Sequence, residues 1–272
     1  MSGIIRFEGV RRSYGDTLAV RSLDLELRPG ELFALLGHNG AGKTTSIKML
    51  VGLLRPEAGR VMVAGHDVVA EAREAAQRIG YVPDQPYLYD KLSGREFLRF
   101  VAEMHGMPAD EATAAIDREI ARFGLERFAD ELAESYSHGM KQRTVFAAAL
   151  LHDPPVLVVD EPLVGLDPHS IRLVKDLLRA RAEAGACVFM STHTLAAAEE
   201  VADRIGVMQQ GELVFLGTVD ELRRRHDAHD VSLEDLYLEL VENKVGGVRP
   251  TDGCVPRAEH DPAFSDAAGG GA

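Results

Sequence analysis

The chain has 272 residues, of which 46% are hydrophobic and 6% aromatic. This composition is typical of globular α/β proteins with an aliphatic core, and no apolar run reaches the ~18 residues that a membrane-spanning helix needs. The formal net charge of −13 argues against general nucleic-acid binding, which requires a basic surface. Residues 1–8 lack a secretory signal pattern, and Cys187 and Cys254 are too few for a disulfide framework. We therefore expect a cytoplasmic protein.

Before residue 84, short apolar or alternating runs predict strands, with a turn at 12–16 between the first two. The strands are expected at 4–8, 17–27, 31–36, 61–64 and 79–82, and a helix at 45–51. Residues 84–150 are then predicted to form a helical insert within the α/β domain. Ser93 and Glu96 form a capping box at the start of its first helix, and a second helix spans 108–123.

After residue 150, two β-rich apolar runs alternate with helical patterns. The elements expected there are a strand at 156–159, a helix from Asp167 to Ala184, a strand at 187–190, a hairpin of 205–209 with 212–216, and closing helices that begin near Thr218 and Ser232. Residues 244–272 are rich in glycine, proline and acidic residues without periodicity, which predicts a disordered tail.

Residues 37–45 fit the phosphate-loop pattern G-x-x-x-x-G-K-[ST] between a predicted strand and a predicted helix. Glycines let backbone N–H groups turn inward around a polyphosphate, and the positive end of the following helix faces the same point. Lys43 would add a charge at the outer phosphates, and the Thr44 hydroxyl would ligate Mg²⁺. The residues expected to bind a nucleotide are Gly37, His38, Asn39, Gly40, Ala41, Gly42, Lys43, Thr44 and Thr45.

Two further motifs carry chemistry in the second half of the chain. Asp160 follows four apolar strand residues, so its carboxylate is expected at the carboxyl end of a strand, where ligand sites of α/β proteins lie. Such a residue suits Mg²⁺ coordination, and the adjacent Glu161 could polarise a water for attack on a γ-phosphate. Ser137 and Gly139 precede a helix and could face a phosphate, although such residues more often only cap the helix.

In their order, these motifs resemble those of the nucleotide-binding subunits of ATP-binding cassette (ABC) transporters, and the resemblance covers about residues 4–240. It implies that Tyr14 stacks on adenine and that residues 136–140 are the signature sequence of the family. It further implies that Asp167 lies in the D-loop at a dimer contact, and that His193 is the switch histidine that contacts the γ-phosphate.

The resemblance also implies the fold and the domain organisation. We expect an α/β P-loop NTPase, with an ABC-type ATPase core, an antiparallel β subdomain and an inserted α-helical subdomain. The ATP-binding domain would span 1–243.

Two positions depart from the family pattern. The family usually has glutamine directly after the proline of the Q-loop, whereas Asp84 occupies that place here and Gln85 follows. Asp84, or else Gln85, would contact the metal. The signature usually reads Leu-Ser-Gly-Gly-Gln, of which only Ser137 and Gly139 match, and Tyr-Ser-x-Gly-Met favours the drug and antibiotic exporter branch.

The implied mechanism needs partners. Two cassettes, identical or different, would pair head to tail with each ATP between the phosphate loop of one and the signature of the other. A separate transmembrane permease subunit would dock on the helices between Pro86 and Phe123, and it alone would hold the chain at the cytoplasmic face of the membrane. The alternatives are a soluble ABC ATPase outside transport and a nucleotide-sensing regulatory subunit; a kinase is less favoured.

Overall fold

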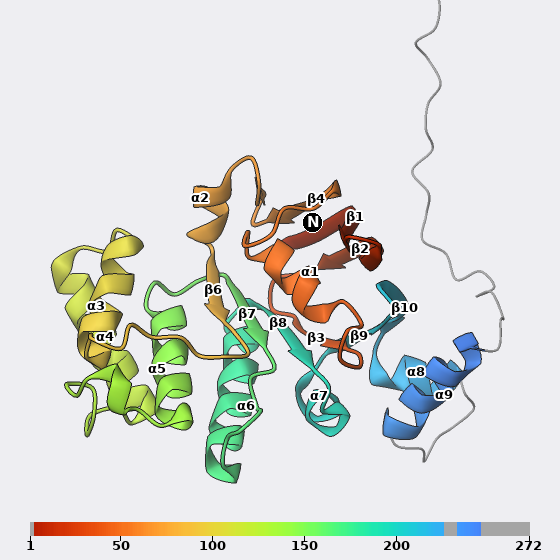
Figure 1. Ribbon diagram of the computed structural model, residues 1–272. Coiled ribbons are helices and arrows are strands. Elements are labelled where there is room, and N and C mark those ends of the chain that lie inside the picture. The colour runs from red at the N-terminus through yellow and green to blue at the C-terminus, as the bar shows by residue number, and fades with distance from the viewer. Residues whose placement is uncertain (1–2, 226–232, 246–272) are drawn as a thin grey trace, which may run out of the picture.

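The computed structural model describes residues 3–225 and 233–245, which form an α/β fold around one mixed sheet (Figure 1). The strands follow one another across the sheet in the order β5-β4-β1-β2-β10-β9-β3-β8-β7-β6. They are β1 (Ile5–Tyr14), β2 (Thr17–Leu27), β3 (Leu32–Leu36), β4 (Ala58–Val63), β5 (His66–Asp67), β6 (Ile79–Val82), β7 (Val156–Asp160), β8 (Cys187–Thr192), β9 (Arg204–Gln209) and β10 (Glu212–Gly217).

Helices flank the parallel part of the sheet and form a separate group beside it (Figure 1). They are α1 (Lys43–Leu50), α2 (Ala72–Ala76), α3 (Gly94–Met104), α4 (Ala109–Phe123), α5 (His138–Leu150), α6 (Pro168–Glu183), α7 (Leu195–Val201), α8 (Val219–Arg225) and α9 (Leu233–Val245), with a short 3₁₀ turn at Ala133–Ser135. Among these described helices, none combines the length and the hydropathy required to cross a membrane.

The parallel strands β3, β8, β7 and β6 form one end of the sheet, with β6 at its edge. Every residue of β3, β7 and β8 is buried, which explains why these strands appear in the sequence as continuous apolar runs rather than alternating ones. Because the three strands are parallel and in register, the segments that follow Leu36, Asp160 and Thr192 emerge at the same edge of the sheet.

The first two strands form an antiparallel layer with β4 and β5. The turn expected at 12–16 is present but shorter than predicted, because β1 continues to Tyr14 and only Gly15 and Asp16 separate it from β2. Register shifts after Phe7 and at Val10 interrupt the regular pairing of β1 with β2. A bulge of this kind places neighbouring residues outside the two-residue alternation, so the sequence pattern does not show that the strand continues.

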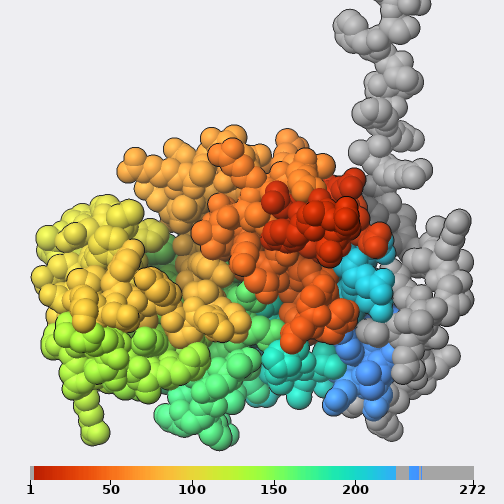
Figure 2. All heavy atoms as spheres, viewed as in Figure 1, coloured from red at the N-terminus to blue at the C-terminus, as the bar shows by residue number. Residues whose placement is uncertain are grey.

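The predicted helical insert is present as α3, α4 and α5, which lie together on one side of the molecule (Figure 2). The expected capping box is confirmed, since Ser93 and Glu96 exchange side-chain and backbone hydrogen bonds at the start of α3. Tyr136 connects the segments of the insert: its hydroxyl accepts from the N–H of Gly94 at 3.1 Å and donates to the carbonyl of Phe128 at 2.6 Å.

The hairpin of β9 and β10 and the Asp167 cap of α6 also agree with the sequence prediction. The short elements β5, α2 and α7 were not predicted. Helix α9 continues through Lys244 and Val245, and the rest of the predicted tail, like the predicted helix start at Ser232, lies outside the described residues.

Candidate functional site

The phosphate-loop motif connects β3 to α1 as the sequence predicts. Gly40 and Gly42 have left-handed backbones, with φ of 83° and 112°. A Cβ atom at Gly42 would in addition clash with the carbonyl oxygen of Ala19, so only glycine fits there. The loop thus brings backbone N–H groups and the positive end of α1 to one place, which is an arrangement suited to bind an anion.

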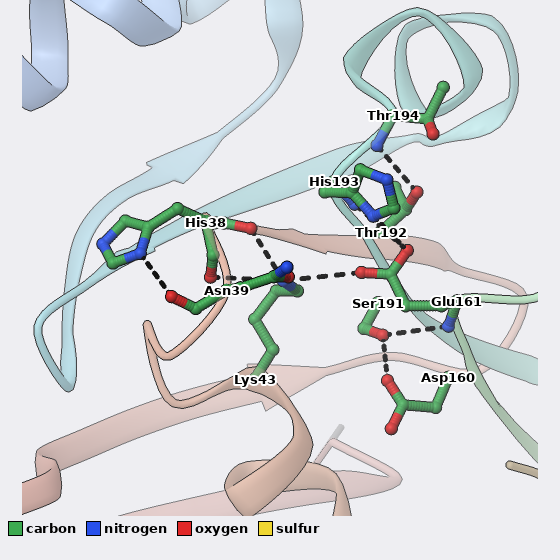
Figure 3. A network of polar contacts seen from close by, with 10 residues as sticks. His38, Asn39, Lys43, Asp160, Glu161, Ser191, Thr192, His193 and Thr194 are labelled. Atoms are coloured by element: carbon green, nitrogen blue, oxygen red, sulfur yellow. Dashed lines mark hydrogen bonds and ion pairs between the residues drawn. The ribbon is translucent and has the colours of Figure 1, made fainter. Parts of the chain in front are cut away.

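Lys43 lies inside this loop and is only 6% exposed. Its Nζ donates to the carbonyl of Gly37 at 2.7 Å and lies 3.4 Å from Oε1 of Glu161 (Figure 3). Oxygens of a polyphosphate in the loop could replace these two oxygens as partners of Lys43, because an ammonium group is a compact charge with three rotatable donors.

Glu161 occupies the centre of the polar network in Figure 3. Its Oε2 accepts from the backbone N–H of His193 at 3.2 Å and lies 2.9 Å from the ring Nδ1 of the same histidine. Its own backbone has a positive φ of 49°, which is rare for a residue other than glycine and is often found at functional sites. The structure therefore brings together Lys43, Glu161 and His193, which come from three separate segments of the chain.

Asp160 lies below this network and is 1% exposed. The hydroxyl of Ser191 donates to its Oδ1, and the side chain of Thr44 is a second hydrogen-bonding partner. Burial raises the pKa of the Asp160 carboxyl, and the negative charges of Asp84 and Glu161 raise it further. A carboxylate that is buried beside two others is unfavourable on its own and becomes favourable when a cation is present.

A pocket of about 600 Å³ opens above the loop and brings residues from distant segments together. Tyr14 stands at its border, 49% exposed, with the guanidinium of Arg12 located 5.4 Å from the ring centroid. Asp84 lines the pocket, whereas Gln85 is not among the residues that line it. The lining residues are Tyr14, Thr17, Leu18, Ala19, Arg21, His38, Asn39, Gly40, Gly42, Lys43, Thr44, Thr45, Asp84, Glu161 and Gln210.

Arg21, Gln210 and Ser191 belong to the site but were not predicted. The Nε of Arg21 donates to the carbonyl of Gln210 at 3.0 Å, and Gly211 donates to the carbonyl of Ala41 at 2.9 Å, so the hairpin between β9 and β10 lies against the phosphate loop. The sequence gives the turn at Gln210, but no local signal places this turn beside a loop 170 positions earlier. Ser191 could have been noticed as the first polar residue after the apolar run of β8.

The remaining predicted residues lie apart from this pocket. Ser137 caps α5, accepting from Met140, and Asp167 caps α6, accepting from the N–H groups of the two residues after Pro168. Among the described residues, a Cβ atom at Gly139 would meet no atom beyond its chain neighbours and the backbone of its own helix. None of these three residues lines the pocket that holds Lys43.

Comparison with known proteins agrees with this geometry. A family profile described as "ABC transporter" matches residues 20–164. The chain is 40% identical over 219 residues to the daunorubicin resistance ATP-binding protein DrrA3 of Streptomyces coeruleorubidus, covering 80% of this chain and 69% of that protein. It is 36% identical over 222 residues to the linearmycin resistance ATP-binding protein LnrL of Bacillus subtilis, with 82% and 71% covered.

A third relative is the Nod factor export ATP-binding protein I of Burkholderia orbicola, 40% identical over 213 residues that cover 78% of this chain and 70% of the relative. Among solved structures, an ATP-binding subunit of an ABC transporter superposes with a TM-score of 0.83 at 31% identity, covering 87% of this chain and 99% of that one. The chain therefore belongs to the ABC transporter family, as an ATP-binding ATPase subunit similar to those of exporters.

Proposed function

We propose that this chain hydrolyses Mg²⁺-ATP at an interface between two cassettes and thereby powers export by a separate transmembrane subunit. The observation that carries the proposal is the position of Glu161, between Lys43 and His193 at the mouth of the phosphate-loop pocket. This position brings three groups together. Lys43 is a cation that can bind phosphate, the Glu161 carboxylate can accept a proton from water, and His193 can contact the γ-phosphate.

Tyr14 is the proposed contact for the adenine base. Its exposed ring borders the pocket, and the nearby Arg12 guanidinium provides a cation–π interaction that holds the ring in place. Stacking a base on such a ring is worth about 1–3 kcal/mol. The triphosphate would then extend along the loop toward Lys43, with the backbone N–H groups of residues 39–45 as donors.

Thr44 and Asp160 would hold Mg²⁺, with Asp84 as an additional oxygen donor. Their oxygens suit this hard cation, and burial together with the nearby Asp84 and Glu161 raises the pKa of Asp160, so a bound cation would stabilise its carboxylate form. Within the described residues there is no group of three or more His, Cys, Asp or Glu side chains that could hold a metal, so phosphate and water oxygens would complete the coordination. When bound, the ion would neutralise phosphate charge and orient the phosphates.

In the proposed reaction, the Glu161 carboxylate accepts the proton of the attacking water. The two hydrogen-bonding contacts with His193 fix one of its oxygens and leave Oε1 directed toward Lys43. His193 is 54% exposed at its side chain, so its ring is able to reach a γ-phosphate placed over the loop. His193 would thus link the presence of the γ-phosphate to the orientation of the Glu161 carboxylate.

A second cassette would complete the site. Three residues lie away from the pocket of their own chain and are exposed or half-buried: Ser137, Gly139 and Asp167. Their two segments lie close to each other, since a Cβ at Gly165, near Asp167, would touch the ring of His138, between Ser137 and Gly139, at 3.3 Å. We propose that this surface faces the phosphates bound to the partner cassette, which is either a second copy or a similar chain.

The membrane subunit would contact the start of the helical insert. Four large apolar side chains gather there while remaining 39–73% exposed, and the Tyr89 ring packs edge-on against two of them. Exposed apolar patches of this kind mark interaction surfaces. The patch consists of Tyr87, Tyr89, Phe100 and Met104. Through it the chain would be held peripherally at the cytoplasmic face of the membrane.

The variant Glu161→Gln tests the proposal. We expect phosphate release to fall at least a hundredfold, because the amide cannot accept a proton, while ATP binding remains. Since hydrolysis would release the pair, the variant should accumulate as a dimer in Mg²⁺-ATP, measured by light scattering during size-exclusion chromatography. Glu183→Gln makes the same charge change at an exposed position of α6 and should behave as wild type. Unchanged turnover would exclude Glu161 as the base, and loss of turnover without dimers would contradict the shared site.

A further inference from the structure

The turn between β9 and β10 contacts two walls of the nucleotide pocket at once. The N–H of Gly211 donates to the carbonyl of Ala41 in the phosphate loop at 2.9 Å, and the carbonyl of Gly211 accepts from the N–H of Arg21 on β2 at 2.8 Å. Strand β10 then pairs with β2 directly beside the turn, at Glu212 and Ser22. The turn therefore fixes the position of Arg21 relative to the phosphate loop.

The side chain of Arg21 lines the same pocket. Its Nε donates to the carbonyl of Gln210 at 3.0 Å, so the turn holds the side chain as well as the backbone. Within the described residues, the two terminal nitrogens of the guanidinium have no hydrogen-bond acceptor. The side chain is thus held at one donor, while the rest of its planar fork is available to a ligand.

The place of Arg21 along β2 is at the phosphate end of the pocket. Tyr14, the proposed contact for the base, pairs with Thr17 at the start of β2. Arg21 is four residues further along the strand, which corresponds to roughly 13 Å at the usual rise per residue. Through the turn it is connected to Ala41 instead. The guanidinium therefore lies closer to the expected position of the phosphates than to that of the base.

The charge of Arg21 is also less compensated than the charge of Lys43. Lys43 is buried and lies 3.4 Å from a carboxylate oxygen of Glu161. The carboxylate of Glu212 lies 3.9 Å from the Nε of Arg21, and both of these side chains are about half exposed, where an ion pair contributes little. A phosphate would be a stronger partner, because a guanidinium can bind it through two parallel charge-assisted hydrogen bonds.

We propose that Arg21 binds a phosphate oxygen of the nucleotide, as a cationic contact that comes from outside the phosphate loop. Because the turn holds the side chain in place before binding, little conformational entropy is lost when the contact forms. The proposal rests on the nucleotide site proposed above, and it adds to that site a residue that the phosphate-loop pattern does not contain.

Arg21→Gln in the full chain removes the charge and the planar fork but keeps the backbone hydrogen bonds of the turn. We expect the Kd values for ATP and ADP, measured by isothermal titration, to rise about fivefold to thirtyfold, as for the loss of a partly exposed charge-assisted hydrogen bond. The affinity for adenosine, measured by competition with a fluorescent ATP analogue, should change by less than about twofold, because adenosine has no phosphate. The KM for ATP should change more than kcat does.

Arg28→Gln is the matched control, since it makes the same replacement at an exposed position just beyond β2 and outside the pocket. It should leave the Kd values unchanged. The proposal is overturned if Arg21→Gln binds ATP as tightly as wild type, or if it weakens adenosine as much as ATP. It is also overturned if the variant only lowers the melting temperature, which would limit Arg21 to holding the turn. Failure of the wild-type chain to bind ATP would instead contradict the nucleotide site itself, so the two failures are distinguishable.

Discussion

At Asp160, the proposed metal binding and the stability of the nucleotide-free fold have opposite requirements. Folding buries its carboxylate and places Asp84 and Glu161 nearby, and both effects raise its pKa. A raised pKa means that the folded state binds the proton more tightly than the unfolded chain, so stability decreases as pH rises through the folded-state pKa. The carboxylate form therefore destabilises the nucleotide-free protein at neutral pH.

Asp160→Asn should remove this destabilisation while keeping an oxygen that can accept from Ser191. We expect the nucleotide-free protein to gain about 1 kcal/mol at pH 7.5, or roughly 2–4 °C in melting temperature, and to lose ATP hydrolysis. The gain should disappear below about pH 4, where both forms are neutral. Asp176→Asn, at an exposed position of α6, should change neither property. A destabilised Asp160→Asn protein would contradict the argument.

Single substitutions of Tyr14 test the proposed stacking of the adenine base. Tyr14→Ala should weaken ATP binding about fivefold to a hundredfold, because it removes the ring on which the base would stack. Tyr14→Phe should retain most of the affinity, since the stacking surface and the cation–π contact with Arg12 both need only the ring. Isothermal titration with ATP measures both variants, and equal losses for alanine and phenylalanine would argue against stacking.

Among the elements, the junction of α3 and α5 contains a pH-sensitive pair. His105, which follows α3, and His152, which follows α5, stack with ring centroids 3.6 Å apart. Burial and the neighbouring His105 lower the pKa of His152 to about 4, and Asp153 and Arg181 are the charged groups nearby. Burial also lowers the pKa of His105. The folded state therefore favours two neutral rings.

The sign of the effect follows from these lowered pKa values. The stability that depends on the neutral rings is complete above about pH 6.5 and is lost as pH falls toward 4. We expect the free energy of unfolding to drop by up to about 2 kcal/mol from His152 alone between pH 7.5 and pH 5. In urea denaturation, His152→Leu should lose much of this pH dependence, whereas replacing the exposed His169 by leucine should not. An unchanged slope in His152→Leu would exclude the pair as the origin.

Local signals explain which elements could be predicted from the sequence. Caps and turns act within four residues, so the Ser93 capping box, the Asp167 cap and the hairpin at Gln210 were all correctly placed. The bulged end of β1 was missed because its register shifts break alternation. Short helices such as α7 have too few turns to show a 3.6-residue period.

The residues of the candidate site likewise fall into those with a local sequence signal and those without one. Lys43 and Asp160 could be predicted because each belongs to a contiguous sequence motif that follows a predicted strand. The contributions of Arg21 and Gln210 depend on contacts between segments that are far apart in the sequence. No local pattern marks such residues, since an arginine in a strand and a glutamine in a turn are both ordinary.

At the scale of the whole molecule, the two halves of the expected ATP site lie in different places. The phosphate loop with Lys43 lines one pocket, while Ser137 and Asp167 start helices that are not part of it. In the part of the chain that the structure describes, the pocket around Lys43 and the exposed starts of α5 and α6 therefore lie apart. Two chains related by a twofold axis would bring each pocket to the other chain's helix starts, giving two equivalent sites.

Mixing two inactive variants tests this arrangement. Lys43→Ala should prevent productive ATP binding in the pocket, and Ser137→Arg should block the surface that faces the partner's pocket. Each protein alone should therefore lack ATPase activity. In an equal mixture, half of the dimers contain one copy of each, and each such dimer has one site with both parts intact. We expect the mixture to recover about a quarter of wild-type activity in a phosphate-release assay.

The control is a mixture of Lys43→Ala with Glu161→Gln. Both changes fall on the same pocket, so every site in that mixture lacks one of the two groups and no activity should return. Recovery in the first mixture without recovery in the second can arise only if Ser137 acts on the pocket of another chain. If neither mixture recovers while wild-type copies do form ATP-dependent dimers, the opposing surface is not the one that contains Ser137.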